Sequence, residues 1–127
     1  MFIYESLDTR IVSSLQAISI CEDNLHKYLS LVNRYLENPP TENYEKHHIL
    51  PKSLFPEYKN LRAHKWNCVM LPYAQHLEAH YYLALFTDDI KMIYAFTKMV
   101  EVSNMLNVDI SLYKEEYSKQ KTNASLI

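Results

Sequence analysis

Residues 41–72 read TENYEKHHILPKSLFPEYKNLRAHKWNCVMLP and lack the helical spacing of apolar residues that is seen on either side of them. The stretch contains three prolines and two short apolar runs, at 48–50 and 68–71. Short runs of this kind between turn-forming residues are typical of β-strands. We therefore predict a small two-stranded β-ribbon around a long irregular loop.

The segment before this ribbon has helical spacing. Between residues 8 and 37, apolar residues recur at three- and four-residue steps, and Asn38-Pro39-Pro40 ends the pattern. The polar cluster at 22–24 divides the segment into two helices, with Asp23 as the expected N-cap of the second. Residues 1–40 are therefore predicted to form N-terminal helices.

The helical pattern returns after Pro72 and continues to residue 87. Thr87 or Asp88 is the expected N-cap of the next helix, and a short last helix is expected at 112–118. A length of 127 residues is typical of one domain. We predict a single domain over residues 1–127, mainly α with a small β insert (α+β), in which 87–127 supplies the C-terminal helices.

The composition excludes several classes of site. The chain has no glycine, although average usage of about 7% would give roughly nine. A P-loop, a dinucleotide-binding fingerprint and an EF-hand loop all need glycine, so no nucleotide cofactor is expected. Cys21 and Cys68 have no Cys-x-x-Cys spacing and are interpreted as buried apolar residues. Since no apolar run reaches 18 residues and no secretory signal is recognisable, we expect a cytoplasmic protein without a membrane partner.

Positive charge is concentrated in one segment. The whole chain has 13 Lys and Arg against 15 Asp and Glu, a net charge of −2. Residues 45–65 nevertheless carry five cationic side chains and two carboxylates, a local charge of +3, together with His47, His48 and His64. A solvated loop can have this composition, and so can a phosphate-binding surface.

Four of the six histidines form two pairs. His76 and His80 are one helical turn apart, so both imidazoles point the same way and can bind one cation. The same spacing also occurs on exposed helices that bind nothing. A zinc protease would need Glu directly after the first His, and Leu77 stands there instead.

The other pair, His47 and His48, lies at the end of a predicted strand. Neighbouring side chains on a strand point to opposite faces, so one ring can bind a metal while the other addresses a substrate. Two exposed loop histidines would give the same sequence.

Three stretches in order, EKHHILPKS at 45–53, NCVMLP at 67–72 and QHLEAH at 75–80, resemble the HNH endonuclease family. The resemblance is to its small phage-borne members, in which a doubled His followed by Ile-x-Pro precedes an Asn on the second strand and a His-x-x-x-His helix. It implies a ββα-metal module over residues 44–86, flanked by N- and C-terminal helices. The loop at 54–60 reads LFPEYKN, where family members carry a Gly-Gly turn.

The resemblance also implies a role for each polar residue. His47 would be a metal ligand, His48 the general base, and Asn67 the residue that holds the loop and orients that base. His76 and His80 would be the remaining metal ligands. The implied activity is metal-dependent hydrolysis of phosphodiester bonds in double-stranded DNA, in the host-cell cytoplasm if the chain is phage-encoded.

The chemistry of these residues suits that activity. Three imidazole ligands favour Zn²⁺, Ni²⁺ or Mn²⁺ over Mg²⁺, which prefers oxygen ligands. Neutral imidazole, with a pKa of about 6.5, can take a proton from water at neutral pH. Lys52, Arg62 and Lys65 flank the metal residues in the only basic segment and are the predicted phosphate contacts.

Two alternatives stay open at the level of sequence. One is a homing or nicking endonuclease with a defined target site. The other is a non-catalytic, metal-stabilised module that binds DNA or protein. The oligomeric state is not predicted.

Overall fold

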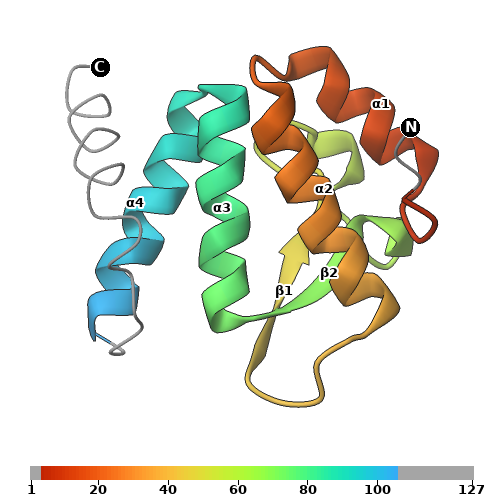
Figure 1. Ribbon diagram of the computed structural model, residues 1–127. Coiled ribbons are helices and arrows are strands. Elements are labelled where there is room, and N and C mark those ends of the chain that lie inside the picture. Colours follow the sequence, from red (N-terminus) through yellow and green to blue (C-terminus); the bar gives the residue numbers. More distant parts are fainter. Residues whose placement is uncertain (1–3, 106–127) are drawn as a thin grey trace.

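The computed structural model describes residues 4–105 of the chain (Figure 1). The elements in this part follow one another in the order α1 (Thr9–Ile18), α2 (Glu22–Glu37), β1 (Tyr44–His48), β2 (Cys68–Pro72), α3 (Tyr73–Thr87) and α4 (Ile90–Met105). Two short 3-10 helices lie between the strands, at Pro56–Tyr58 and Lys65–Asn67. The predicted class, mainly α with a small β insert, is confirmed. The helix predicted at 112–118 lies outside the described residues.

The N-terminal helices differ from the prediction in how they begin. Asp8 is the N-cap of α1, since its carboxylate accepts a hydrogen bond from the Arg10 backbone N–H at 2.8 Å. Cys21, not Asp23, occupies the N-cap position of α2, and its side chain makes no capping hydrogen bond. Asp23 lies in the first turn instead, where its negative charge interacts favourably with the helix dipole. The helix ends directly before the Asn-Pro-Pro stop, as predicted.

The turn between α3 and α4 is capped by a residue next to the predicted ones. Asp88 ends α3 in the left-handed conformation, with φ of 49°. The Asp89 carboxylate accepts the Lys91 backbone N–H at 2.8 Å, which makes Asp89 the N-cap of α4. The prediction of Thr87 or Asp88 was therefore wrong, because Asp88 already terminates the preceding helix.

The two strands pair antiparallel, with His47 opposite Val69 and His48 opposite Cys68. The first strand was predicted at 48–50, but β1 ends at His48 and its first three residues are exposed. Ile49 and Leu50 follow the strand and are fully buried. The apolar run therefore marks the point where the chain leaves the strand and enters the core.

Helix α3 packs between α2 and α4, and the ribbon lies across one end of α2 and α3 (Figure 1). Two groups of buried side chains hold this arrangement. The larger one joins α1, α2, the ribbon and α3 and also includes Met92 of α4, and the smaller one joins α3 to α4. Because α3 contributes to both groups, it fixes the ribbon and α4 relative to each other. Among residues 4–105, no helix combines the length and apolar character needed to cross a lipid bilayer.

Asn67, which is fully buried, holds the long loop between the strands. Its side-chain Oδ1 accepts a hydrogen bond from the Leu50 N–H at 2.6 Å, and its Nδ2 donates to the backbone carbonyls of Leu50 and Tyr58, both at 3.2 Å. Its backbone carbonyl accepts from the Ile49 N–H at 2.9 Å. One residue thus ties the chain after β1 to the first 3-10 helix.

Aromatic packing gives the loop a second support. The rings of Tyr58, His64 and Trp66 meet edge to face, and the Tyr58 and Trp66 centroids are 4.9 Å apart. The Arg10 guanidinium lies 4.0 Å from the centroid of the Trp66 ring, which connects the loop to α1. The loop is therefore held by side chains rather than by a glycine turn.

We expect Asn67→Ala to lower the free energy of unfolding by about 2–4 kcal/mol, because three buried backbone groups lose their hydrogen-bond partner. Urea denaturation followed by circular dichroism measures this loss. The control is Asn38→Ala, which alters an exposed residue after α2 and should change the free energy by no more than about 0.5 kcal/mol. Equal effects of the two substitutions would contradict the anchoring role.

Candidate metal centre

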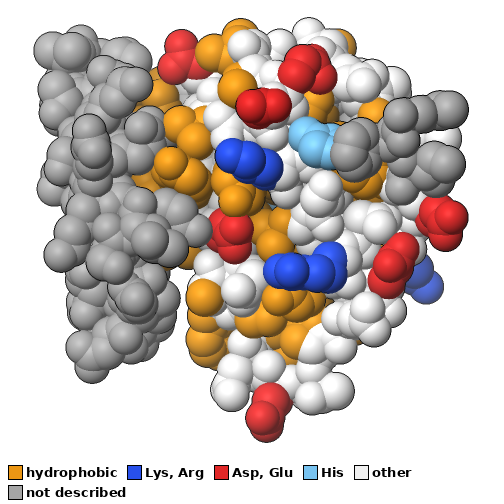
Figure 2. Space-filling model, in the orientation of Figure 1, with side chains coloured by type: hydrophobic (Ala, Val, Ile, Leu, Met, Phe, Trp, Pro, Cys, Tyr) orange, Lys and Arg blue, Asp and Glu red, His pale blue; other side chains and the backbone are white. Residues whose placement is uncertain are grey.

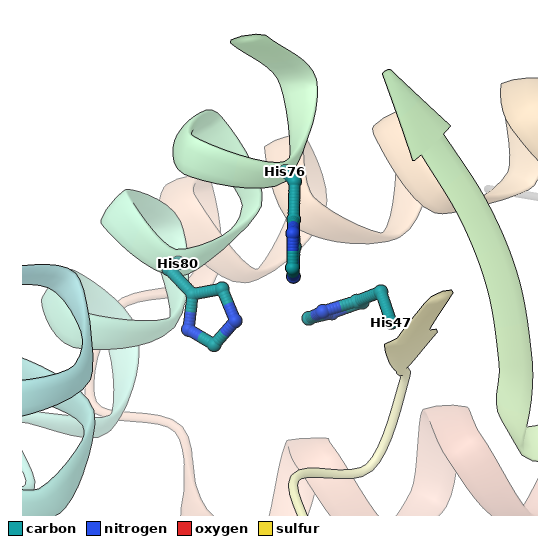
Figure 3. A group of neighbouring side chains, drawn as sticks. All are labelled: His47, His76 and His80. Carbon is teal, nitrogen blue, oxygen red and sulfur yellow. The ribbon is translucent and has the colours of Figure 1, made fainter. Parts of the chain in front are cut away.

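Three histidine rings from two elements point toward one another (Figure 3). His47 comes from the end of β1, and His76 and His80 come from one face of α3. The ring centroids are 5.1 Å apart for His47 and His76, 5.1 Å for His47 and His80, and 5.0 Å for His76 and His80. One ring nitrogen from each residue lies within 4.8 Å of the other two. The fold therefore brings together the three histidines that the sequence suggested as metal ligands.

The order of elements explains this meeting. Helix α3 begins at Tyr73, directly after β2 ends at Pro72, so its first turns lie beside the ribbon. The spacing of His76 and His80 places both rings on the same side of the helix. His47 is buried on the ribbon, and this side of α3 faces it.

Tyr28 of α2 determines which nitrogen of His47 carries the proton. The Tyr28 hydroxyl is 2.7 Å from the Ile49 backbone carbonyl and 2.7 Å from Nε2 of His47. A carbonyl only accepts, so the single hydroxyl proton goes to Ile49, and the hydroxyl oxygen accepts a hydrogen bond from His47 Nε2–H. Burial raises the pKa of Tyr28 well above its usual value, so the hydroxyl keeps its proton. The lone pair of His47 is therefore on Nδ1.

A carboxylate determines which nitrogen of His76 carries the proton. The Glu45 Oε1 atom is 3.1 Å from His76 Nδ1. Since a carboxylate accepts hydrogen bonds, Nδ1–H donates and the lone pair of His76 is on Nε2. Histidines that bind metals usually donate their other ring N–H in this way, which fixes the orientation of the ring.

His80 is held differently. Its Nδ1 atom is buried and has no hydrogen-bond partner within residues 4–105. Burial, with His76 nearby as a further cause, lowers the pKa of His80 to about 3. Burial, followed by the neighbouring His80, His76 and His48 rings, also holds the pKa of His47 well below its usual value. Both rings are thus neutral at pH 7, which is the state that binds metal ions.

The donor set fits a divalent transition metal. Imidazole nitrogen is a common ligand of Zn²⁺ and Ni²⁺, whereas Mg²⁺ prefers oxygen. Three protein ligands are also the usual number in catalytic zinc sites, which leave a coordination position for water or substrate. His47, His76 and His80 can therefore hold one ion and leave it accessible from the adjoining cleft.

His48 has a separate partner. Its Nε2 atom is 2.9 Å from the backbone carbonyl of Lys59, so Nε2–H donates and the lone pair is on Nδ1. Asn67 forms no hydrogen bond with this ring. It binds the backbone of Leu50, two residues after His48, and of Tyr58, one residue before Lys59. The two adjacent histidines thus bind different groups, as the alternation of side chains along a strand led us to expect.

A cleft of about 500 Å³ adjoins the cluster and is lined by all four of these histidines. Among the described residues 4–105, its lining also includes three lysines and no carboxylate: Lys46 of β1, Lys52 of the loop and Lys91 of α4. The face drawn in Figure 2 instead shows acidic and basic side chains interspersed. The described lining of the cleft therefore carries positive charge on a chain whose net charge is −2.

The structure separates the three predicted phosphate contacts. Lys52 lines the cleft, whereas Arg62 and Lys65 are exposed and do not line it. Sequence reasoning did not single out Lys46 or Lys91. Lys91 had no signal of its own, because it belongs to a helix far along the chain that the fold brings beside the ribbon.

Comparisons with known proteins give no match for this chain. No family model, curated protein or solved structure matches the chain. What the site does is therefore inferred from its residues.

We expect Tyr28→Phe to lower zinc affinity by about 10- to 100-fold, because His47 loses the group that fixes its tautomer and orientation. Competition titration against a zinc-binding dye measures the affinity. Tyr35→Phe is the matched control, since Tyr35 is partly buried on the same helix and packs against the core away from the rings. Unchanged affinity in Tyr28→Phe would remove this tyrosine from the site.

The metal-free protein should lose stability as the pH falls below about 6.5, the pKa of an exposed histidine. Below that pH, His47 and His80 become protonated in the unfolded chain. In the folded protein they stay neutral, because burial lowers their pKa values. The free energy of unfolding should fall by up to about 1.4 kcal/mol per pH unit for each ring, and for His80 the loss continues toward pH 3. Urea denaturation at pH 7.5 and 5 measures it. His80→Gln should show a shallower dependence, and an unchanged dependence would contradict the burial argument.

Proposed function

We propose that this chain is a metal-dependent DNA endonuclease of the HNH type, which hydrolyses phosphodiester bonds in double-stranded DNA with His48 as general base. The observation that carries the proposal is the presence, in one lysine-lined cleft, of a three-histidine cluster and a fourth histidine with its own hydrogen-bond partner. The first supplies a metal site and the second a proton acceptor, which are the two groups that this hydrolysis needs.

His48 would take the proton of the attacking water. Its Nδ1 lone pair accepts that proton while the water oxygen bonds to phosphorus and the bond from phosphorus to the 3′ oxygen breaks. The departing 3′ oxygen is then protonated by solvent. A positioned base of this kind typically contributes about 10²- to 10⁴-fold to the rate.

His47, His76 and His80 would hold the metal ion, with Zn²⁺, Ni²⁺ or Mn²⁺ favoured over Mg²⁺. Such an ion supplies Lewis-acid stabilisation of the negative charge on the phosphate and on the leaving 3′ oxygen. Tyr28 and Glu45 hold the His47 and His76 rings in the orientation that directs their lone pairs to the ion.

Asn67 would act as a positioning residue. Its buried side chain binds the main chain of Leu50, two residues after His48, and of Tyr58, one residue before the Lys59 carbonyl that His48 binds. Moving either segment would turn the His48 ring away from its water.

The lysines would attract the phosphate backbone. Lys46, Lys52 and Lys91 line the cleft, and Arg62 and Lys65 remain proposed contacts to phosphates outside it. Because the rest of the chain is acidic, these side chains would provide most of the attraction, and DNA affinity would fall steeply with salt.

The experiment that tests the proposal is cleavage of supercoiled plasmid with Zn²⁺, Ni²⁺, Mn²⁺ or Mg²⁺, alongside zinc titrations. We expect His48→Ala to lower the cleavage rate by at least about 100-fold while zinc affinity changes by less than about twofold, because the base is not a ligand. His47→Ala should abolish both plasmid cleavage and zinc binding. His26→Ala, which alters a histidine of α2 that does not line the cleft, should retain both cleavage and zinc binding.

Two results would count against the proposal. Equal loss of zinc binding in His48→Ala would show that the roles of the two adjacent histidines are reversed. Zinc binding by the wild-type protein without relaxation or linearisation of plasmid under any ion would favour a non-catalytic, metal-stabilised binding module.

A further inference from the structure

The cleft has a wall that phosphodiester hydrolysis alone does not require. Helix α4 contributes the apolar side chains of Ile90, Met92 and Ala95 to the lining, together with the ring of Tyr94. Attraction of a phosphate needs cations and hydrogen-bond donors. Met92 is buried in the core, whereas the Tyr94 ring is exposed, so this wall offers an aromatic surface to another part of the ligand.

Tyr94 is the prominent residue of this wall. It is 56% exposed, although it is one of the largest apolar side chains on α4. The ammonium group of Lys98 lies 5.4 Å from the centroid of its ring. An exposed aromatic ring beside cationic side chains is the combination on which proteins stack the bases of single-stranded nucleic acid.

The positive charges are distributed to suit a nucleotide strand. Lys46, Lys52 and Lys91 come from the strand, the loop and α4, so three separate segments bring a cation to the cleft that the apolar wall lines. A base lying on that wall would have phosphates before and after it, and both could find a cation.

The size of the cleft also favours a single nucleotide base as its occupant. At about 500 Å³ it falls within the range of pockets that enclose a small ligand. Duplex DNA presents phosphates and sugars on its outside, and its bases are stacked within. Only a base taken out of the stack can fill an apolar pocket of this kind.

We propose that the cleft receives an unstacked base next to the cleaved phosphate, with Tyr94 as its stacking surface. The preferred substrate is then single-stranded DNA or a locally unpaired position in a duplex. This inference rests on the proposed function, which supplies the reason for a DNA strand to pass the four histidines.

The test measures binding to three fluorescein-labelled DNAs. They are a single strand of 15 nucleotides, an intact duplex of the same sequence, and that duplex with one bulged nucleotide. EDTA keeps all three DNAs intact, and circular dichroism verifies the fold of each protein. We expect the wild-type protein to bind the single strand and the bulged duplex about tenfold more tightly than the intact duplex.

Tyr94→Ala should weaken binding of the single strand by at least about fivefold and of the intact duplex by less than twofold. Tyr73→Ala is the matched control, because Tyr73 is 45% exposed on α3 and does not line the cleft. It should leave all three affinities within twofold. Lys91→Ala should reduce the salt dependence of single-strand binding by roughly 0.7 in the log–log slope.

The inference is overturned if Tyr94→Ala and Tyr73→Ala behave alike, or if the intact duplex binds at least as tightly as the single strand. These outcomes are separable from failure of the nuclease proposal. Plasmid cleavage without an effect of Tyr94 would overturn the base-binding inference alone. A full effect of Tyr94 without cleavage under any metal would overturn the nuclease proposal alone.

Discussion

The hydroxyl of Tyr28 has one proton, and the structure of the site depends on where that proton goes. It is donated to the Ile49 carbonyl, so the oxygen must accept from His47 Nε2–H. That hydrogen bond leaves the Nδ1 lone pair of His47 for the cluster. The same hydroxyl holds the backbone directly after β1 against α2. A helix from the N-terminal part of the chain thereby sets the chemical state of a ring on the ribbon.

This constraint connects the fold to the proposed chemistry. His76 and His80 are placed by their spacing on α3, while His47 reaches them because the ribbon packs against both α2 and α3. On the other side of the ribbon, Asn67 fixes the loop whose Lys59 carbonyl binds His48. The flanking helices therefore do more than cover the ribbon. Helix α2 supports His47 of the three-histidine cluster, and α4 supplies a wall of the cleft.

The sequence predicted the parts of this arrangement that depend on local spacing. The helical patterns, the Pro-Pro stop after α2 and the His76–His80 pair all reflect contacts within a few residues, and the structure contains them. Capping was predicted less well, because α2 begins after Cys21, which makes no capping hydrogen bond, and because Asp88 ends α3 and leaves the N-cap position of α4 to Asp89. The site roles of Tyr28 and Lys91 were missed because they arise only when distant segments meet. In the sequence, Tyr28 is one of the apolar residues that recur at helical spacing.

The central claim is that the imidazoles of His47, His76 and His80 form one metal centre. X-ray absorption spectroscopy of the zinc-loaded protein tests it most directly. The account predicts one zinc ion per chain, bound by three imidazole nitrogens at about 2.0–2.1 Å and completed by oxygen. A zinc ion bound by fewer than three imidazoles, or a chain that retains no zinc, would contradict it.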